Sequence, residues 1–493
     1  MISEKTNSRI FTIISYGMLF VYATAAVIFM ISLITTHLFP VLYLVIIALA
    51  LAIVGVVLTF LQGHSHVLSI IGSALFLALA VLLIIASTFM RTFNVVVEEV
   101  TTPTAIRTDV IAVYVLRDDP AESIEDARDY QFGIIGGQVD SHIRETIVNI
   151  NELLEDSIQL QEYEDAIAML ASLREGRSQA IIVDEAYVRI FGSVEGFEWI
   201  YTELRALKME VFEVEIPNLV YSPELMPPEL IPPEEVPDSF VIYLSGIDTY
   251  GGVTARSRSD VNIIVVVNTV DKRILILSTP RDAVVTFPVT GGATDKLTHA
   301  GIYGVDQSMA AVANLYGLEI DYFLRLNFTG FMDIVDALGG VNVYSEFGFT
   351  VYPIRTFTPG WNHLSGIEAL AFARERGAFA EGDIQRGRNQ MELIRALIME
   401  AASPALLINF NQTMNAVSGS FETNMPRDHI TQLIRMQLSD MAEWTIVTYS
   451  TIGYSALAPT FSIPGHNVFV MNLTQASIEE ARRLIAETMG IVE

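Results

Sequence analysis

The chain has 493 residues, more than one ordinary hydrophobic core accommodates, so we expect about two or three folded units. Its formal net charge of −28 argues against a nucleic-acid partner, because binding of nucleic acid depends on neutralising phosphate charge. The chain contains no cysteine, which excludes disulfides and thiolate metal sites.

The apolar residues are concentrated at the N-terminus, in three long stretches without Asp, Glu, Lys or Arg. These stretches cover roughly residues 10–35, 41–61 and 67–90. Each has about the 20 residues that a helix needs to cross a bilayer. A cleaved signal peptide would be a single, shorter apolar run, so we predict a three-helix transmembrane anchor within residues 1–92.

Basic residues predict the orientation of this anchor. Lys5 and Arg9 precede the first helix, whereas neither connection between the helices carries Lys or Arg. Because basic flanking residues favour the cytoplasmic side, we expect a cytoplasmic N-terminus and an extracytoplasmic chain after about residue 91. The sequence therefore predicts a multi-pass protein of the plasma membrane.

Residues 93–220 alternate between strand-like and helix-like patterns, which predicts a small α/β accessory domain. We expect strands at Asp109–Leu116, Ala180–Val183 and Glu210–Glu215, and helices at Ser123–Gln131, Asn149–Arg174 and Gly196–Leu207. The glycines of Phe132–Gly137 lack the full G-x-G-x-x-G pattern between a strand and a helix, so we interpret them as an ordinary turn.

A domain boundary follows at residues 221–239, which hold six prolines and five acidic residues. This composition predicts a stiff, extended linker. Residues 240–493 form the last domain, in which strands and helices alternate irregularly. We therefore expect an α/β fold with a mixed β-sheet and helices on both faces.

Charged residues stand at the ends of three β-branched runs that are typical of buried strands. The runs are Val241–Leu244, Val261–Val267 and Ile274–Leu277. If the last two pair as a hairpin about residues 269–272, antiparallel pairing places Asp260 opposite Arg281. The first strand should bring Asp248 to the same edge, and Arg258 precedes Asp260 by two residues. These two carboxylates and two guanidinium groups predict a Mg²⁺ and phosphate site.

Later charged residues extend this predicted site. Arg374 and Arg376 are two apart and would point to one face of an extended segment. Arg386 and Gln390 are four apart and share one face of a predicted helix at about residues 384–402. Guanidinium groups bind pyrophosphate oxygens in pairs, and Mg²⁺ takes one or two carboxylates together with phosphate oxygens. Any one of these charge pairs could be a surface ion pair worth about 0–1 kcal/mol, but the whole set favours a site.

Seven motifs resemble the LytR–CpsA–Psr family in order and spacing over about Ser239–Pro404. They are Gly246-Ile247-Asp248, Arg258-Ser259-Asp260, Pro280-Arg281-Asp282, Lys296 with His299-Ala300, Asp336 to Val341, Leu364 to Arg376, and Asp383 with Arg386 and Gln390. The three membrane helices and the accessory domain resemble the capsule CpsA-like branch. Many relatives carry Arg directly before the last glutamine, where this chain has Asn389. Either Arg388 substitutes for that arginine, or the contacts to the head group are weaker.

The resemblance implies a phosphotransferase that moves an anionic glycopolymer, of capsule or teichoic-acid type, from undecaprenyl-pyrophosphate to peptidoglycan. It implies Mg²⁺, or alternatively Mn²⁺, held by Asp248 and Asp260. It implies pyrophosphate binding by Arg258, Arg281, Lys296, Arg374, Arg376, Arg386 and Gln390. It implies catalytic roles for Asp260, Arg281, Asp282, Arg374 and Arg376, with Asp260 or Asp282 accepting the acceptor's proton. It also implies an apolar tunnel for the lipid, with Phe323, Phe328, Phe331, Ile334 and Leu338 as candidate wall residues.

Two other functions stay open at this point. A non-catalytic regulator would bind a polyprenyl phosphate through the same arginines and report its level through the membrane helices. A pyrophosphatase would release phosphate without a sugar acceptor. The expected partners of the ligase are the lipid-linked glycopolymer, peptidoglycan and the bilayer, and no nucleic acid.

Overall fold

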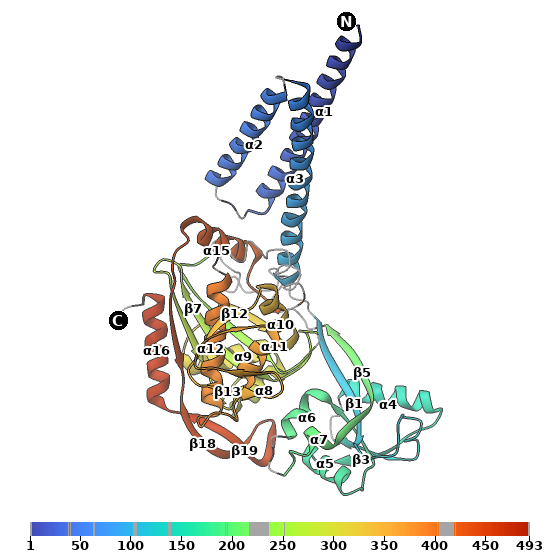
Figure 1. Ribbon diagram of the computed structural model, residues 1–493. Coiled ribbons are helices and arrows are strands. Elements are labelled where there is room, and N and C mark those ends of the chain that lie inside the picture. The colour runs from blue at the N-terminus through green and yellow to red at the C-terminus, as the bar shows by residue number, and fades with distance from the viewer. Residues whose placement is uncertain are drawn as a thin grey trace.

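The chain forms a stalk of three helices and two α/β units, shown in the computed structural model of Figure 1. The structure describes residues 2–491 except 38, 40, 63–64, 102–105, 137–139, 193, 195, 216–235, 251, 402, 404–418 and 420. Most of the linker predicted at residues 221–239 lies outside the described residues.

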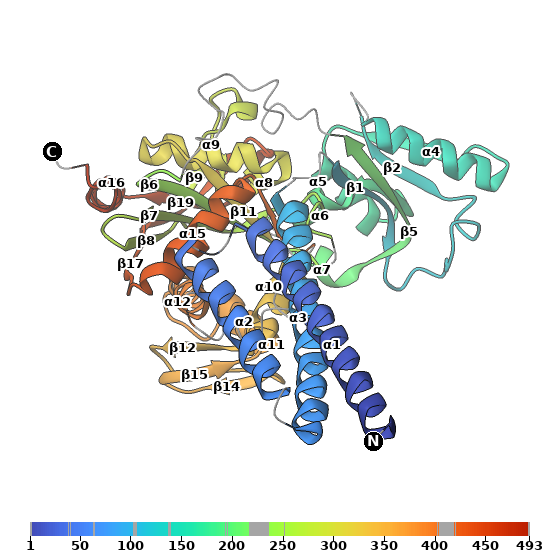
Figure 2. The same cartoon turned by 90° about the horizontal axis from the view of Figure 1, so that it is seen from above.

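The stalk consists of the three predicted apolar helices. They are α1 (Ile2–Thr35), α2 (Val41–Gln62) and α3 (His66–Thr101). Each contains a segment of 22 to 25 residues that is long and apolar enough to cross a membrane. The helices run side by side (Figures 1 and 2), and most of their large side chains are exposed, as lipid-facing side chains are. A small core around Tyr22, Leu58 and Phe76 joins them.

The N-terminal α/β unit is a five-stranded mixed sheet in the order β3-β2-β4-β1-β5. Strand β2 pairs in parallel with β3 and β4, whereas β1 is antiparallel to β4 and β5. The strands are β1 (Ile106–Leu116), β2 (Gln131–Ile135), β3 (Gln159–Tyr163), β4 (Ala180–Asp184) and β5 (Leu204–Glu215). The helices are α4 (Ser141–Leu154), α5 (Ala166–Arg174), α6 (Glu185–Phe191) and α7 (Ile200–Glu203).

The long helix predicted at Asn149–Arg174 is wrong, because local capping interrupts it. Helix α4 ends at Glu155, which has a left-handed φ of 52°. The edge strand β3 follows, and Asp165 starts α5 by accepting a hydrogen bond from the backbone N–H of Ala168. Two short amphipathic helices and an edge strand therefore replace one long helix.

Three further predictions in this unit are wrong. Residues 123–130 form turns and bends instead of a helix. Four of the residues interpreted as a turn, 132–135, lie in strand β2, where a side chain at Gly133 would crowd Ile181 and Met169 at 3.2 Å. The helix predicted at Gly196–Leu207 is much shorter in the structure, where α7 has only four residues. It ends early because β5 begins at Leu204 and pairs along β1.

The C-terminal unit contains a six-stranded mixed sheet in the order β16-β11-β6-β7-β8-β17. The three predicted strands form its antiparallel centre, and β11 and β17 add in parallel on either side. The strands are β6 (Ser239–Ile247), β7 (Ser259–Asn268), β8 (Arg273–Ser278), β11 (Tyr322–Leu326), β16 (Phe421–Thr423) and β17 (Thr445–Ser450).

Helices cover both faces of this sheet, as the sequence predicts. One face packs against α8 (Leu297–Tyr303), α9 (Val305–Tyr316) and α16 (Gln475–Met489). The other packs against α12 (Asp383–Ala401) and α15 (Arg427–Asp440). Strands β6 to β8 are apolar along their length, and their successive side chains point to opposite faces of the sheet. Each face therefore buries its own hydrophobic cluster beneath the helices.

Smaller elements surround the main sheet. Helices α10 (Phe328–Ala337) and α11 (Gly366–Arg374) pack with short strands on one side. These short strands are β12 (Val341–Ser345), β13 (Phe349–Val351), β14 (Arg355–Phe357) and β15 (Gly360–Leu364). Two further antiparallel pairs are β9 (Val284–Val285) with β10 (Asp295–Lys296) and β18 (Gly453–Thr460) with β19 (Ile463–Leu473). Helix α10 stops at Gly339 and Gly340 as predicted, both with positive φ.

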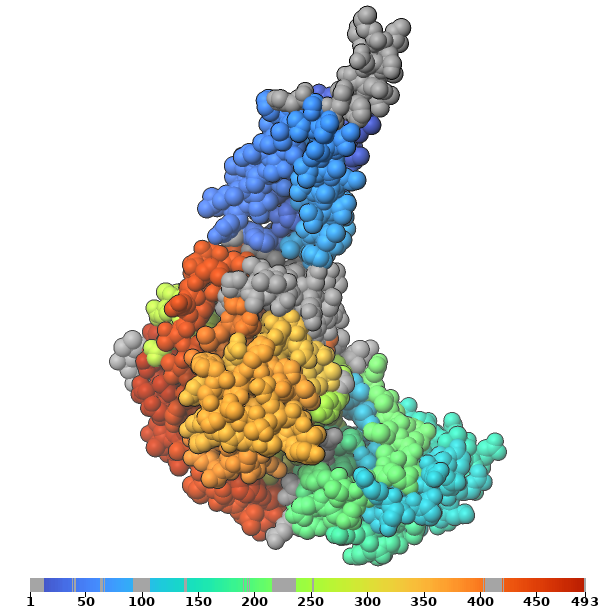
Figure 3. Space-filling model, in the orientation of Figure 1, coloured from blue at the N-terminus to red at the C-terminus, as the bar shows by residue number. Residues whose placement is uncertain are grey.

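The two α/β units share a hydrophobic core and lie against each other (Figure 3). Residues of β4, α5 and α6 pack in one cluster with Ile302 of α8 and with Ile463, Val468 and Val470 of β19. Backbone hydrogen bonds also join Thr108 of β1 to Thr254 and Arg256. The N-terminal unit is therefore docked on the C-terminal unit through both apolar and polar contacts.

Candidate functional site

The predicted hairpin brings the first pair of charged residues together. Strand β7 ends at Asn268 and β8 begins at Arg273, so the turn lies where the sequence predicts it. At the other end of the hairpin, Arg281 Nη1 donates to Asp260 Oδ2 at 2.6 Å. The second oxygen of Asp260 accepts from the hydroxyl of Thr298 at 2.9 Å, so α8 closes the same edge.

Asp248 and Arg258 form a second pair at this edge. Arg258 Nη2 donates to Asp248 Oδ2 at 2.9 Å, and both side chains are largely buried. The register of β6 and β7 shifts between Gly246 and Ile247, which re-aims the chain toward the edge. A side chain at Gly246 would lie 2.8 Å from Val261, so glycine permits this close approach.

Asp282 and Lys296 continue the cluster. Lys296 Nζ lies 3.1 Å from Asp282 Oδ1, and Arg281 Nε lies 3.6 Å from Asp282 Oδ2. Lys296 stands at the junction of β10 and α8 and is almost fully buried. This buried lysine is therefore charge-compensated by Asp282 on the pocket wall.

The first turns of α12 contribute Arg386 and Gln390. Arg386 Nη2 lies 2.5 Å from Asp383 Oδ1, and Gln390 Nε2 donates to the carbonyl of Ala373 at 3.1 Å. Arg388 instead pairs with exposed Glu381 and does not face this cluster. The hypothesis that Arg388 substitutes for the arginine missing at position 389 is therefore wrong, because the helix turns Arg388 to the outside.

Arg374 and Arg376 reach the cluster by a different route from the one predicted. Arg374 is the last residue of α11 and Arg376 follows the helix, so the two do not lie in one extended segment. The guanidinium carbon of Arg374 lies 4.4 Å from the centre of the Phe328 ring. Within the part of the chain that the structure describes, neither arginine forms an ion pair with a carboxylate.

All of these side chains line one pocket of about 650 Å³. The pocket holds every residue predicted for the site: Asp248, Arg258, Asp260, Arg281, Asp282, Lys296, Arg374, Arg376, Arg386 and Gln390. Its apolar lining residues include Leu244, Val261, Phe328, Phe331 and Ile394. Charged and apolar side chains therefore line one continuous space.

The predicted tunnel wall is correct only in part. Phe328 and Phe331 line the pocket. The prediction that Phe323 lines the tunnel is wrong, because this side chain is fully buried in the hydrophobic cluster on the opposite face of the sheet. Ile334 and Leu338 do not line the pocket either, since they lie further along α10 toward its C-terminal end.

The charges of the pocket shift the pKa values of its acids and bases. Burial opposes ionisation of Asp260, but Arg281, Arg258 and Arg386 outweigh it and hold the pKa of Asp260 well below its usual range. The pKa of Asp383 is raised, chiefly by burial. The pKa of Arg386 is lowered, again chiefly by burial. The Nε atoms of Arg281 and Arg386 are buried and have no hydrogen-bond partner among the described residues.

The predicted metal ligands fit a magnesium ion by their chemistry. The described residues contain no group of three or more His, Cys, Asp or Glu side chains that could hold a metal alone. Mg²⁺ does not need such a cage, because it binds through one or two carboxylates, water and substrate phosphates. Asp248 and Asp260 supply two carboxylates on the pocket wall.

The pocket also holds residues to which the sequence analysis gave no role. Thr298 binds Asp260, and His299, which was named only as part of a motif, faces the pocket while its Nδ1 lies 2.7 Å from Asp295. Glu198 and Tyr201 reach the pocket from the N-terminal unit. No sequence signal placed them there, because their position depends on how the two units dock.

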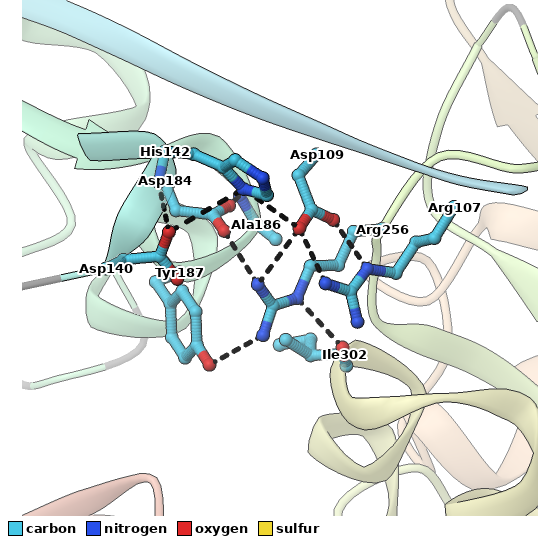
Figure 4. A network of polar contacts seen from close by, with 9 residues as sticks. All are labelled: Arg107, Asp109, Asp140, His142, Asp184, Ala186, Tyr187, Arg256 and Ile302. Atoms are coloured by element: carbon cyan, nitrogen blue, oxygen red, sulfur yellow. Dashed lines mark hydrogen bonds and ion pairs between the residues drawn. The ribbon is translucent and has the colours of Figure 1, made fainter. Parts of the chain in front are cut away.

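A second charged cluster, shown in Figure 4, lies where the two units meet. Arg256 Nη1 donates to Asp184 Oδ2 at 2.9 Å, and its Nε donates to the carbonyl of Ile302 at 3.0 Å. Its Nη2 donates to the Tyr187 hydroxyl at 2.9 Å. Asp109 lies 3.8 Å away. All three guanidinium nitrogens of Arg256 thus donate to protein groups. Arg256 is only two residues away from Arg258 in the chain.

Comparisons with known proteins point to one family. The family model of the LytR_cpsA_psr family matches residues 213–477, more than half of the chain. The polyisoprenyl-teichoic acid–peptidoglycan teichoic acid transferase TagU of Bacillus anthracis is 35% identical over 190 residues, and TagT of Bacillus subtilis is 34% identical over 199 residues. Each alignment covers 38% of this chain and 61% of the relative. The crystal structure of Bacillus subtilis TagV is 27% identical, with a TM-score of 0.44 over 52% of this chain and 99% of that chain.

Proposed function

We propose, from the premise that the chain belongs to the LytR_cpsA_psr family, that it transfers an anionic glycopolymer from a polyprenyl pyrophosphate to peptidoglycan. The polymer is of capsule or teichoic-acid type, and the donor carrier is undecaprenyl-pyrophosphate. Relatives that match 38% of the chain are named teichoic acid transferases that act between polyisoprenyl-linked teichoic acid and peptidoglycan. That naming supports the proposal for this chain.

The observation that carries this proposal is the composition of the pocket. One space of about 650 Å³ is lined both by arginines, aspartates and a lysine and by apolar side chains. A prenyl pyrophosphate has the matching halves, since its diphosphate needs cationic donors and its chain needs burial away from water. A soluble nucleotide or sugar phosphate would leave the interior lined by Phe331 and Ile394 without a partner.

Within this proposal the arginines bind and orient the diphosphate. Arg374 and Arg376 have no ion pair among the described residues and offer whole guanidinium groups to phosphate oxygens. Arg281 and Arg386 each retain a buried Nε without a hydrogen-bond partner. Arg258, Lys296 and Gln390 complete the set on the pocket wall. Stabilising the charge on the transferring phosphate is the main way in which such a site accelerates transfer.

The transfer is a single exchange at phosphorus. The oxygen of an acceptor hydroxyl bonds to the phosphorus that carries the polymer, and the bond from that phosphorus to the bridging oxygen breaks. Prenyl monophosphate leaves with the bridging oxygen. Asp282 accepts the hydroxyl proton. Asp260 is the weaker candidate for this step, because its lowered pKa makes its carboxylate a poor base.

Two acidic residues of the pocket are the proposed ligands of the metal cofactor. Asp248 and Asp260 would hold Mg²⁺, or Mn²⁺, which supplies charge neutralisation of the diphosphate when bound. The three helices of the stalk would anchor the chain in the plasma membrane, with the N-terminus in the cytoplasm and the pocket outside. In that orientation the pocket is on the same side as peptidoglycan.

The proposal is tested with the purified full chain in lipid nanodiscs, a lipid-linked glycopolymer, peptidoglycan and Mg²⁺. We expect polymer joined to peptidoglycan through a phosphodiester. Asp260→Ala should abolish the product, whereas Arg483→Ala, which removes an exposed arginine of α16, should not. Tight donor binding without turnover would instead identify a regulator. Release of phosphate without acceptor would identify a pyrophosphatase.

A further inference from the structure

The N-terminal unit contributes side chains to the pocket of the C-terminal unit. Glu198 and Tyr201 lie on the pocket wall together with Asp248 and Arg258. The Tyr201 side chain is half exposed, at 52%, although its neighbours Trp199 and Ile200 are buried. Its ring is thus presented to the pocket from a segment that is itself anchored in the core.

The backbone of the N-terminal unit holds the Tyr201 ring in place. A Cβ atom at Gly192 would lie 2.5 Å from the ring of Tyr201, so the ring rests directly on the glycine backbone. Gly192 lines the pocket as well. Tyr201 and Arg258 line the same pocket, so the ring shares this space with the cluster of charged side chains.

A second aromatic side chain stands on the same rim. Phe469 of β19 lines the pocket and is 42% exposed. Its neighbour Val468 forms a β-bridge with Val194 of the N-terminal unit. The bridge and the shared hydrophobic core keep the two aromatic side chains on a rigid frame. Arg256, with its three satisfied nitrogens, ties the frame to the strand that carries Arg258 and Asp260 (Figure 4).

From these observations we propose that Tyr201, Glu198 and Phe469 form a saccharide subsite at the rim of the pocket, next to the diphosphate site. Exposed, rigid aromatic rings bind the apolar face of a pyranose, and a carboxylate accepts hydrogen bonds from its hydroxyl groups. The subsite takes the sugar directly linked to the diphosphate of the donor or the sugar that carries the acceptor hydroxyl. The inference rests on the proposed transferase function and assigns to the N-terminal unit a share in substrate recognition.

The test measures binding of two probes to the full chain in nanodiscs by calorimetry. The first probe is geranylgeranyl pyrophosphate, and the second is the same lipid pyrophosphate carrying one N-acetylglucosamine. In parallel, KM and kcat are measured for a soluble muropeptide acceptor. Tyr201→Ala should weaken binding of the sugar-bearing probe, or raise KM for the muropeptide, by about tenfold. Binding of geranylgeranyl pyrophosphate should stay unchanged.

Two further variants separate recognition from structure. Tyr201→Phe keeps the ring and should restore most of the affinity lost in Tyr201→Ala. Tyr454→Ala removes a tyrosine of β18 that is even more exposed, at 63%, and lies outside the pocket, so it should change nothing. The inference is overturned if Tyr201→Ala leaves both sugar-dependent values unchanged, or weakens the sugar-free probe to the same extent. If wild-type protein does not bind geranylgeranyl pyrophosphate at all, the proposed function fails, and the inference fails with it.

Discussion

Two clusters of arginine and aspartate lie close together in this molecule and differ in how their charges are satisfied. Around Arg256, between the units, every guanidinium nitrogen donates to a protein group. In the pocket, Arg281 and Arg386 keep buried Nε atoms without hydrogen-bond partners among the described residues, and Arg374 stacks on an aromatic ring. The hydrogen-bonding capacity of Arg256 is used by the protein at all three nitrogens, whereas in the pocket part of that capacity is left over for the diphosphate that we propose.

The difference shows that the role of an arginine depends on whether its N–H donors already have partners in the protein. A buried pair such as Arg256–Asp184 holds two units in register, and replacing one partner leaves a buried charge without compensation. An arginine such as Arg374, which has no carboxylate partner in the described chain, contributes little to folding. In the function that we propose, it binds the diphosphate. The two clusters should therefore respond in opposite ways to substitution.

The largest effect on stability is expected at Arg256. Arg256→Ala leaves Asp184 buried without its cation, although burial already raises the pKa of that carboxyl group. We expect a loss of about 3–5 kcal/mol in the free energy of unfolding, measured by thermal unfolding of the full chain in detergent. Arg374→Ala serves as the matched control and should leave the unfolding temperature unchanged. Equal destabilisation by both variants would contradict the distinction between the clusters.

The largest effect on activity is expected at Arg374. Removing a cation aimed at the transferring phosphate should lower kcat by about 10²–10³-fold. Arg374→Lys should recover only a part of the rate, because lysine cannot offer two coplanar donors. Initial rates of polymer transfer to peptidoglycan give the values. Unchanged transfer by Arg374→Ala would remove this arginine from the site.

Ligand binding should stabilise the protein through the pocket cluster alone. Geranylgeranyl pyrophosphate with Mg²⁺, at 100 times its Kd, should add about 2.7 kcal/mol to the stability of the wild-type protein. The corresponding rise in unfolding temperature should persist in Arg256→Met and shrink in Arg374→Met. A rise that disappears in Arg256→Met but not in Arg374→Met would instead place the phosphate site in the cluster around Arg256.

The smallest predicted effect is on how the free energy of unfolding changes at acid pH. The pKa of Asp260 is lowered on folding, so its contribution to stability is present above its unfolded pKa, about 4, and is lost as pH falls. The pKa of Asp184 is raised, so its contribution is present at low pH and is lost as pH rises. Between about pH 5 and pH 3, Asp260→Asn should make the acid loss of stability shallower, and Asp184→Asn should make it steeper.

Thermal unfolding in EDTA at each pH measures these slopes without bound metal. The Tyr454→Ala variant, which removes an exposed side chain that is uncharged at acid pH and lies outside both clusters, should keep the wild-type slope. Slopes that change in the same direction in both aspartate variants would contradict the opposite pKa shifts of Asp260 and Asp184.

The pocket of the C-terminal unit could be predicted from the sequence because it depends on neighbours in the chain. The β-branched runs specify buried strands, a short hairpin joins two of them, and antiparallel pairing then brings Asp260 to Arg281. Helical periodicity likewise placed Arg386 and Gln390 on one face. Here local patterns and the fold agree.

The rest could not be predicted, because it depends on contacts between distant segments. The break at Glu155 comes from a single left-handed residue, which hydrophobic periodicity does not reveal. Tyr201 reaches the pocket only because Gly192 leaves room for its ring and the units dock through Arg256. Phe323 had the expected spacing for a tunnel wall, but the strand turns it to the opposite face.

The central claim is that the pocket holds a prenyl diphosphate at its arginines. The most direct measurement is a density map of the full chain purified from its host membrane. The account predicts a prenyl chain beside Phe331 and Ile394, with its phosphates within hydrogen-bond distance of Arg281 and Arg374. An empty pocket after saturation with the lipid-linked donor, or phosphates bound away from these arginines, would contradict it.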